Sequence, residues 1–221
     1  MKKHIWLIPC GPGSNPEATI ESIMFQCPNE QIMLVNDGTD LDRFSVDNIQ
    51  IVSTEKPGTG CAHALNTGIK ALKDKDYDWI YRMDADDAVY RGHDRDKQAE
   101  QADETELVVA GSMVTPTCRK MIVKGLEPDD IRLALDRRIN PIYHPATIIR
   151  MSALLKVKTW SGQCWPEQYG MAEDYALWLK ICKIGKIKPW QSYWTWYVPN
   201  GQNNNKEKND MLCKAAEDAG L

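Results

Sequence analysis

The sequence predicts an α/β fold in which helices flank a mostly parallel sheet within a single compact domain. Its length of 221 residues suits one large domain. Hydrophobic residues make up 43% of the chain and charged residues 26%, which matches folded globular proteins and excludes a disordered or collagen-like chain. Short apolar runs alternate with amphipathic segments through the first half, and this alternation is typical of parallel strand-helix-strand units.

Local signals define the elements of the first half. Asn15 is a favourable N-cap residue and Pro16 suits the first turn of a helix, whereas the turn sequence Asn36-Asp37-Gly38 ends an apolar run. Strands are therefore expected over residues 4–9, 31–35, 49–53, 78–83 and 107–114, and helices over residues 16–26 and 60–72.

The second half is less regular. A helix opens at Glu127-Pro128, and a periodic helix over residues 172–184 ends at Gly185, a typical C-cap residue. A strand is expected over residues 146–149, an extended segment with largely buried tryptophans over 187–198, and a loop over 200–205 before a short terminal helix. We expect one domain with three regions that differ in function, namely residues 1–115, 116–199 and 200–221.

The cysteine content and the hydropathy indicate the cellular compartment. The seven cysteines include no CxxC pair, which excludes a zinc ribbon and a fully paired disulfide framework and favours reduced thiols in a cytoplasm. No apolar run reaches the roughly 18 residues of a membrane-spanning helix, and Pro9 and Pro12 interrupt the N-terminal apolar stretch. We expect a cytoplasmic protein without a transmembrane segment, with peripheral attachment to the inner membrane face as the alternative.

Charge is distributed unevenly along the chain. Residues 1–115 carry 11 Lys and Arg against 20 Asp and Glu, a net charge of −9, whereas residues 116–221 carry 16 against 11, a net charge of +5. An acidic half suits metal ions and a basic half suits an anionic partner, although solvated surface also produces such an imbalance.

The first glycine-rich loop argues against two common nucleotide sites. The sequence GPGSNP at residues 11–16 approaches a dinucleotide fingerprint, but Pro16 occupies the position where a small residue permits close helix packing. The chain also contains no GxxxxGK[ST] phosphate loop. Binding of NAD in a Rossmann site and of phosphate in a P-loop are therefore disfavoured.

An acidic loop, Asp84-Ala85-Asp86-Asp87, follows the expected strand over residues 78–83. The pattern Asp-x-Asp occurs five times in the chain, so the pattern alone decides nothing. Its position does distinguish this copy, because ligands of open parallel sheets bind beyond the carboxyl ends of the strands. Carboxylates there favour a divalent cation that bridges a diphosphate, and an acidic turn with helix-capping aspartates is the alternative.

Four further residues carry candidate chemistry. Asp37 ends a strand and could accept an N–H from uracil, thymine or guanine, or form an Asx-turn. The pair Glu173-Asp174 begins a helix, where it can cap the helix dipole or supply a general base. His144 lies in a rigid loop, where a structural role is the alternative to a contact with substrate.

Six sequence blocks, in this order along the chain, resemble the family 2 glycosyltransferases of GT-A fold. They are PEATIESIMFQ, LVNDGTD, GTGCAHALNTGI, IYRMDADD, NPIYHPATIIR and AEDYALWLKICKIGKI. The resemblance covers nearly the whole chain from residue 5 to about residue 198, and the fourth and sixth blocks are the most diagnostic.

The resemblance implies an inverting glycosyltransferase that moves a sugar from a nucleotide-diphosphate donor, which we expect to be a UDP-sugar, to an acceptor hydroxyl. By this similarity Asp37 contacts the base, Asp84 the ribose side, and Asp86 the Mn²⁺ or Mg²⁺ cofactor on the diphosphate. Asp174, with Glu173 beside it, is the catalytic base. Further donor contacts are expected at Pro9, Asn66 and Arg82.

The acceptor and two rival functions remain open. The basic second half suggests a phosphate-bearing acceptor contacted by Lys183, Lys186 and His144, and a glycan, a lipid-linked glycan and a hydroxymethylated nucleic acid all stay open.

A sugar-nucleotide nucleotidylyltransferase needs Arg and Lys in its glycine-rich loop, and residues 11–16 contain neither. A non-catalytic nucleotide-sugar binding module is disfavoured by the presence of Asp86, Glu173 and Asp174 together. The oligomeric state is left open.

Overall fold

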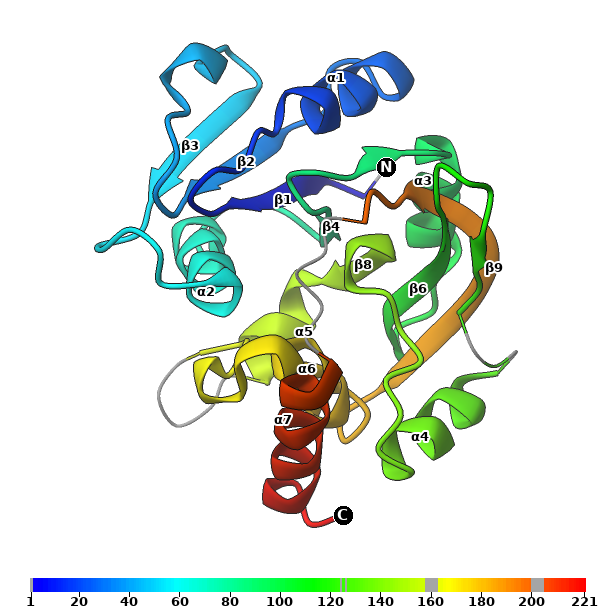
Figure 1. The fold of residues 1–221 in the computed structure, drawn as a ribbon. Coiled ribbons are helices and arrows are strands. Elements are labelled where there is room, and N and C mark those ends of the chain that lie inside the picture. Colours follow the sequence, from blue (N-terminus) through cyan, green and yellow to red (C-terminus); the bar gives the residue numbers. More distant parts are fainter. Residues whose placement is uncertain (1, 124, 126, 158–162, 200–204) are drawn as a thin grey trace.

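The computed structural model describes residues 2–123, 125, 127–157, 163–199 and 205–221. Within these residues one nine-stranded sheet runs in the order β3-β2-β1-β4-β8-β6-β9-β5, with β7 paired to β6 (Figure 1). The strands are β1 His4–Cys10, β2 Ile32–Asn36, β3 Ile49–Ser53, β4 Trp79–Arg82, β5 Ala88–Val89, β6 Glu106–Val114, β7 Lys120–Met121, β8 Thr147–Arg150 and β9 Lys186–Trp196. The helices are α1 Glu17–Gln26, α2 Cys61–Leu72, α3 Gly92–Gln101, α4 Pro128–Asp136, α5 Met151–Lys156, α6 Glu173–Ile181 and α7 Asn205–Asp218.

Strand direction divides the sheet into two parts. Strands β3, β2, β1 and β4 are parallel to one another, and β6 is parallel to β9. Strand β8 lies between these groups and is antiparallel to both β4 and β6. The predicted α/β fold with a mixed, mostly parallel sheet is confirmed. Strand β8 departs from the parallel strand-helix-strand pattern of the first half, because a short apolar run carries no signal for strand direction.

Alternating side chains of β1 pack into two hydrophobic cores, one on each face of the sheet. Ile5 and Leu7 pack on the face covered by α2 and α6, whereas Trp6 and Ile8 pack on the face covered by α1 and α3. This alternation follows from the two-residue repeat of a strand. Each fully buried aliphatic side chain contributes about 1.5–3 kcal/mol, so the sheet is held from both sides.

A glycine brings α2 close to the sheet. A Cβ atom at Gly68 would lie 2.5 Å from Leu7 Cδ1 and 3.0 Å from Val35 Cγ2. Only a residue without a side chain fits this contact. The close approach fixes the N-terminal end of α2 beside the carboxyl ends of β1 and β2 (Figure 1).

Most expected elements are present, with shifted ends. Helix α1 begins at Glu17 with Pro16 as N-cap, although Asn15 Oδ1 still accepts the Glu17 N–H at 3.3 Å. Helix α7 has 14 residues and is longer than expected, and residues 200–204 of the expected loop lie outside the described residues. Trp194 is fully buried in the core, and Trp190 packs partly against it.

Two structural findings concern the cysteines and the length of the helices. None of the seven cysteines, all of which lie within the described residues, forms a disulfide bond. Among the helices of the described ranges, none combines the length and apolar composition that crossing a membrane requires.

Candidate active site

A cavity of about 1150 Å³ opens at the carboxyl ends of β1, β2 and β4. The loops after these strands, the start of α2, the segment before α6 and the first turns of α7 line it. The sequence places the candidate residues on several distant segments, and the fold brings most of them to this one cavity. Those that line it are Pro9, Asp37, Arg82, Asp84, Asp86, His144, Glu173 and Asp174.

The acidic loop brings three carboxylates together, of which Asp84 and Asp86 line the cavity. Ligand oxygens of Asp84, Asp86 and Asp87 all lie within 4.8 Å of one another. Asp86 is exposed, whereas Asp87 is buried. Burial, followed by the negative charges of Asp84 and Asp86, raises the pKa of Asp87 to about 8.

The chemistry of this triad fits a divalent cation. Asp87 Oδ1 accepts the Val198 N–H at 2.9 Å, but its buried Oδ2 has no hydrogen-bond partner among the described residues. Buried carboxylate oxygens are normally paired, and oxygen-only ligand sets suit Mg²⁺ and Mn²⁺. The triad can therefore hold a divalent metal, with Asp87 as a candidate ligand that sequence reasoning did not single out.

Two neighbours hold the acidic loop in place. Arg82 is almost completely buried, and its Nη2 pairs with Asp84 Oδ1 at 2.5 Å. The adjacent Asp84 carboxylate helps keep the pKa of this guanidinium raised although burial alone would lower it. From the other side, Thr19 Oγ1 of α1 donates to the backbone oxygen of Asp87 at 2.6 Å. The loop is thus fixed by the strand that precedes it and by α1.

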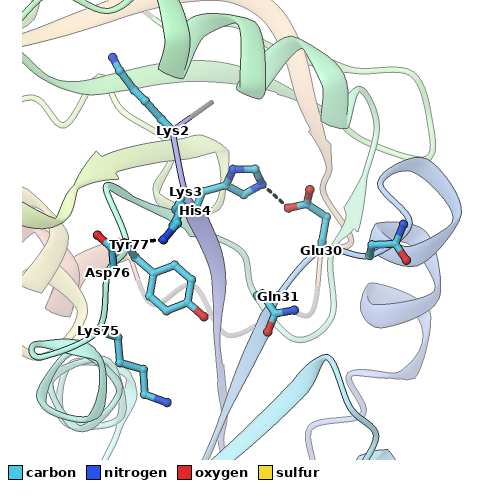
Figure 2. A pocket seen from close by; sticks show the side chains of 9 residues that line it. Lys2, Lys3, His4, Glu30, Gln31, Lys75, Asp76 and Tyr77 are labelled. Carbon is cyan, nitrogen blue, oxygen red and sulfur yellow. Dashed lines mark hydrogen bonds and ion pairs between the residues drawn. The ribbon is translucent and has the colours of Figure 1, made fainter.

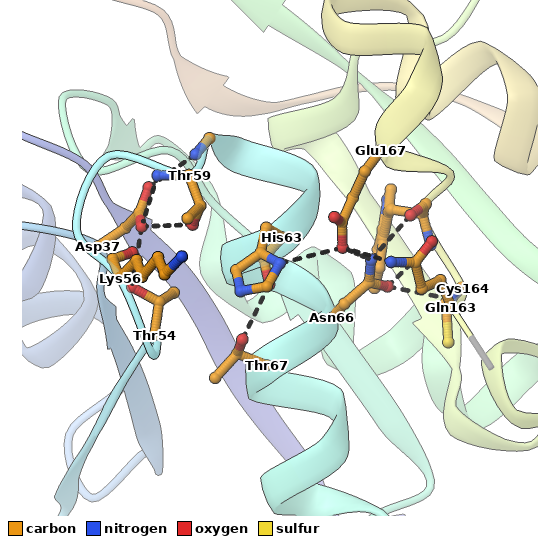
Figure 3. A network of polar contacts seen from close by, with 12 residues as sticks. Asp37, Thr54, Lys56, Thr59, His63, Asn66, Thr67, Gln163, Cys164 and Glu167 are labelled. Atoms are coloured by element: carbon orange, nitrogen blue, oxygen red, sulfur yellow. Dashed lines mark hydrogen bonds and ion pairs between the residues drawn. The ribbon is translucent and has the colours of Figure 1, made fainter. Parts of the chain in front are cut away.

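Asp37 is bound by the loop that leads into α2 (Figure 3). Its Oδ1 accepts from Thr59 N at 3.0 Å, Thr59 Oγ1 at 2.7 Å and Thr54 Oγ1 at 2.9 Å, and its Oδ2 accepts from Gly60 N at 2.8 Å. Burial raises the carboxyl pKa, but the hydrogen bonds from Thr59, Gly60 and Thr54 outweigh it, so the pKa of Asp37 is lowered. Asp37 is therefore a fixed anion that accepts three hydrogen bonds on Oδ1 and one on Oδ2.

Asn66 does not line the cavity. Its Oδ1 accepts from Cys164 N and Trp165 N, both at 3.0 Å, and its Nδ2 donates to Trp165 O at 2.8 Å and Glu167 Oε1 at 3.2 Å. His63 Nδ1 also lies 3.2 Å from Glu167 Oε1 (Figure 3). Asn66 is thus engaged with the segment before α6, and of this network Glu167 reaches the cavity. A direct donor contact at Asn66 has no support in this geometry.

Glu173 and Asp174 begin α6 and are both buried at the cavity wall. Asp174 Oδ2 accepts from Asn140 Nδ2 at 2.8 Å, and its Oδ1 accepts the Tyr175 N–H at 2.7 Å. Burial and the charge of Asp174 raise the pKa of Glu173 to about 8. The pKa of Asp174 is also raised by burial, but Lys208, Tyr175 N–H and Asn140 oppose the rise. The surroundings therefore keep the negative charge of the pair on Asp174.

His144 packs behind this acidic pair. Its Nε2 accepts from Trp165 Nε1 at 3.2 Å, and its Nδ1 lies 4.0 Å from Glu173 Oε1. Burial holds the pKa of His144 well below its ordinary value, and the charges of Arg82 and Lys208 add to this effect. His144 is accordingly a neutral imidazole that lines the cavity and orders Trp165.

One cation at this cavity, Lys208, comes from a part of the chain that the sequence did not point to. Lys208 of α7 lines the cavity, and its positive charge opposes the rise in the pKa of both Glu173 and Asp174. Lys183 and Lys186 lie beyond the other end of α6, outside the cavity lining, and Lys183 Nζ donates to Ala219 O at 3.2 Å. Their role as acceptor contacts remains a prediction to which this cavity adds no support.

Replacing Lys208 with Gln should shift the acidic limb of the rate profile to higher pH. The positive charge opposes the burial-driven rise in the pKa of Asp174, so its removal should raise that pKa further and Asp174 should ionise at higher pH. We expect a shift of roughly 0.5–1 pH unit, less than the about 1–3 units that a direct ion-pair partner gives. Lys214→Gln, an exposed change on the same helix, is the control. Superimposable profiles for the two variants would contradict a charge effect of Lys208.

The chain is similar to one protein family and to several solved structures. Residues 16–154 match the model of Glycosyl transferase family 2. The crystal structure of S. aureus TarS 1-349 has a TM-score of 0.64 at 16% sequence identity, and the match covers 96% of this chain and 70% of that one. No curated protein sequence matches the chain significantly.

Two ligand complexes of TarS 1-349 share the same architecture. The complex with UDP-GlcNAc has a TM-score of 0.64 at 16% identity and covers 91% of this chain and 60% of that one. The complex with UDP has a TM-score of 0.61 at 18% identity and covers 96% and 70%. At these identities the similarity establishes a GT-A-like fold. Because the family model covers more than half of the sequence, the chain belongs to glycosyltransferase family 2.

Proposed function

We propose that this glycosyltransferase moves a sugar from a UDP-sugar to an acceptor hydroxyl, with inversion at the anomeric carbon. The observation that carries the proposal is that Asp84 and Asp86 of the acidic triad line the same cavity as the Glu173-Asp174 pair. The first group suits the diphosphate with its metal, and the second suits the hydroxyl that attacks. A site that only binds a nucleotide sugar does not need the second group.

The donor assignment rests on Asp37 and on the similar proteins. Asp37 is held anionic and lines the cavity, and its carboxylate would accept the N3–H of uracil. Crystal structures of TarS, which shares this fold, contain UDP and UDP-GlcNAc. Pro9 and residues 11–15 line the same end of the cavity, where they would pack against the nucleoside.

Mn²⁺ or Mg²⁺ held through Asp86, with Asp84 and Asp87 beside it, would stabilise the negative charge on the departing diphosphate. Arg82 keeps Asp84 oriented toward this position. Thr19 fixes the backbone of the loop, so the carboxylates are organised before donor binds. This preorganisation lowers the energetic cost of assembling the site.

Asp174 would accept the acceptor proton. The acceptor oxygen forms a bond to the anomeric carbon as the bond from that carbon to the diphosphate oxygen breaks, and UDP leaves. Asn140, the Tyr175 N–H and Lys208 favour the ionised form of Asp174, which is the form a base requires. Glu173, with its pKa raised to about 8, is mostly protonated at neutral pH.

A screen of nucleotide sugars tests this function. UDP-, GDP-, ADP- and dTDP-sugars are incubated singly with the protein and Mn²⁺ or Mg²⁺, and nucleotide diphosphate release is measured. We expect release from one or more UDP-sugars only, and its loss in excess chelator. Release from another nucleotide class alone would overturn the donor assignment, and the absence of both release and binding would overturn the function.

A further inference from the structure

A second group of metal-ligating side chains lies where α1 and α3 meet, on the α1 side of the sheet (Figure 1). Cys27 directly follows the last residue of α1, whereas His93 and Asp96 lie three residues apart on α3. Residues with this spacing share one face of a helix. Ligand atoms of all three side chains lie within 4.8 Å of one another.

The absence of a side chain at Gly92 of α3 leaves space for the Cys27 thiol. A Cβ atom at Gly92 would overlap with Cys27 Sγ, so only glycine lets the sulfur approach this closely. Gln26 fixes the same junction, because its Oε1 accepts the Gly92 N–H at 3.0 Å. The position of the sulfur beside His93 therefore follows from packing of the main chain.

Neighbouring polar groups orient the carboxylate of Asp96. Tyr81 Oη donates to Asp96 Oδ1 at 2.9 Å, and His4 Nε2 lies 3.7 Å from the same oxygen. His4 in turn pairs with Glu30, as Figure 2 shows from the adjoining pocket. Hydrogen bonds of this kind around metal ligands fix their orientation and increase metal affinity.

We propose that Cys27, His93 and Asp96 form a zinc site, with water as the fourth ligand. Thiolate and imidazole ligands select Zn²⁺ over Mg²⁺ and Ca²⁺. Cys27 and His93 supply a sulfur and a nitrogen ligand, whereas the acidic triad supplies only carboxylate oxygens. The two sites would therefore take metals of different classes. Without metal, burial raises the pKa of the Cys27 thiol to about 12, and zinc binding would release its proton.

The site would have a structural role linked to the acidic loop. Helix α1 holds that loop through Thr19, and α3 follows it along the chain after β5. Zinc bound by Cys27 and by α3 would join the two elements that flank the loop. Its loss should lower thermal stability without removing any group from the cavity.

Cobalt titration of the metal-free protein tests the site. We expect one equivalent of the bound Co²⁺ to give a thiolate-to-cobalt charge-transfer band, and Zn²⁺ to displace it. Cys27→Ser should abolish the band. His93→Ala, which changes an exposed side chain and should leave the fold intact, should weaken binding by more than about 10–100-fold, the range reported for lost outer-shell partners.

Two control variants separate this site from others. Cys118→Ser changes an exposed cysteine outside the cluster and should keep the band. Asp86→Ala should also keep it, so failure of the proposed catalytic metal and failure of this site are distinguishable. Absence of the band in the wild type, or a band and affinity unchanged in both Cys27→Ser and His93→Ala, would overturn the proposal.

Discussion

Replacing Asp86 with alanine should lower the rate of sugar transfer by about 10³-fold or more. The reason is electrostatic, because a bound metal ion contributes several kcal/mol by stabilising charge on the leaving diphosphate. Asp86 is the exposed member of the acidic triad and lines the cavity together with Asp84. The measurement is UDP release from the donor found in the nucleotide-sugar screen, across a range of Mn²⁺ concentrations.

A second Asp-x-Asp copy supplies the control for this substitution. Asp74 belongs to the pattern at residues 74 and 76 but is highly exposed on the surface, near Lys73. Asp74→Ala should turn over donor like the wild type. Normal turnover by Asp86→Ala, or by the wild type in excess chelator, would show that the metal role assigned to Asp86 is wrong.

Replacing Asp174 with asparagine should reduce transfer by about 10²-fold or more while donor affinity stays nearly unchanged. General-base catalysis is commonly worth about 10²–10⁴-fold, and asparagine keeps the size of the side chain while removing its basicity. Asn140 and the Tyr175 N–H mark Asp174 as the ionised member of the pair. Single-turnover transfer and donor binding are measured separately.

Glu173→Gln is the matched control for Asp174→Asn. Because the pKa of Glu173 is raised to about 8, this side chain is largely neutral at pH 7, and glutamine resembles its protonated form. We expect a small effect on transfer at pH 7. A large loss in Glu173→Gln with near-normal Asp174→Asn would exchange the roles of the two acids.

Sequence reasoning located the parts of the site that depend on local order. The strand before Asp84 and the helix that begins at Glu173 are both present, because apolar runs and their ends set short elements directly. Each candidate at the carboxyl end of a parallel strand lines the cavity, since parallel strands end at one edge of a sheet.

Contacts between distant segments account for what sequence reasoning missed. Asp87 is buried and accepts a hydrogen bond from the N–H of Val198, which lies 111 residues away. Lys208 reaches the cavity because α7 packs beside the segment before α6. Asn66 lies in a block typical of the family, yet its amide binds residues about 100 positions later. No periodicity or local motif encodes these pairings.

A crystal structure of the chain with UDP and Mn²⁺ would show whether donor and metal meet in this cavity. We expect uracil against Asp37, the metal on Asp86 in contact with the diphosphate, and Asp174 facing the space where the sugar would lie. UDP bound outside this cavity, for instance in the pocket lined by Lys2, Lys3 and His4 (Figure 2), or UDP in the cavity with Mn²⁺ absent from the acidic loop, would contradict it.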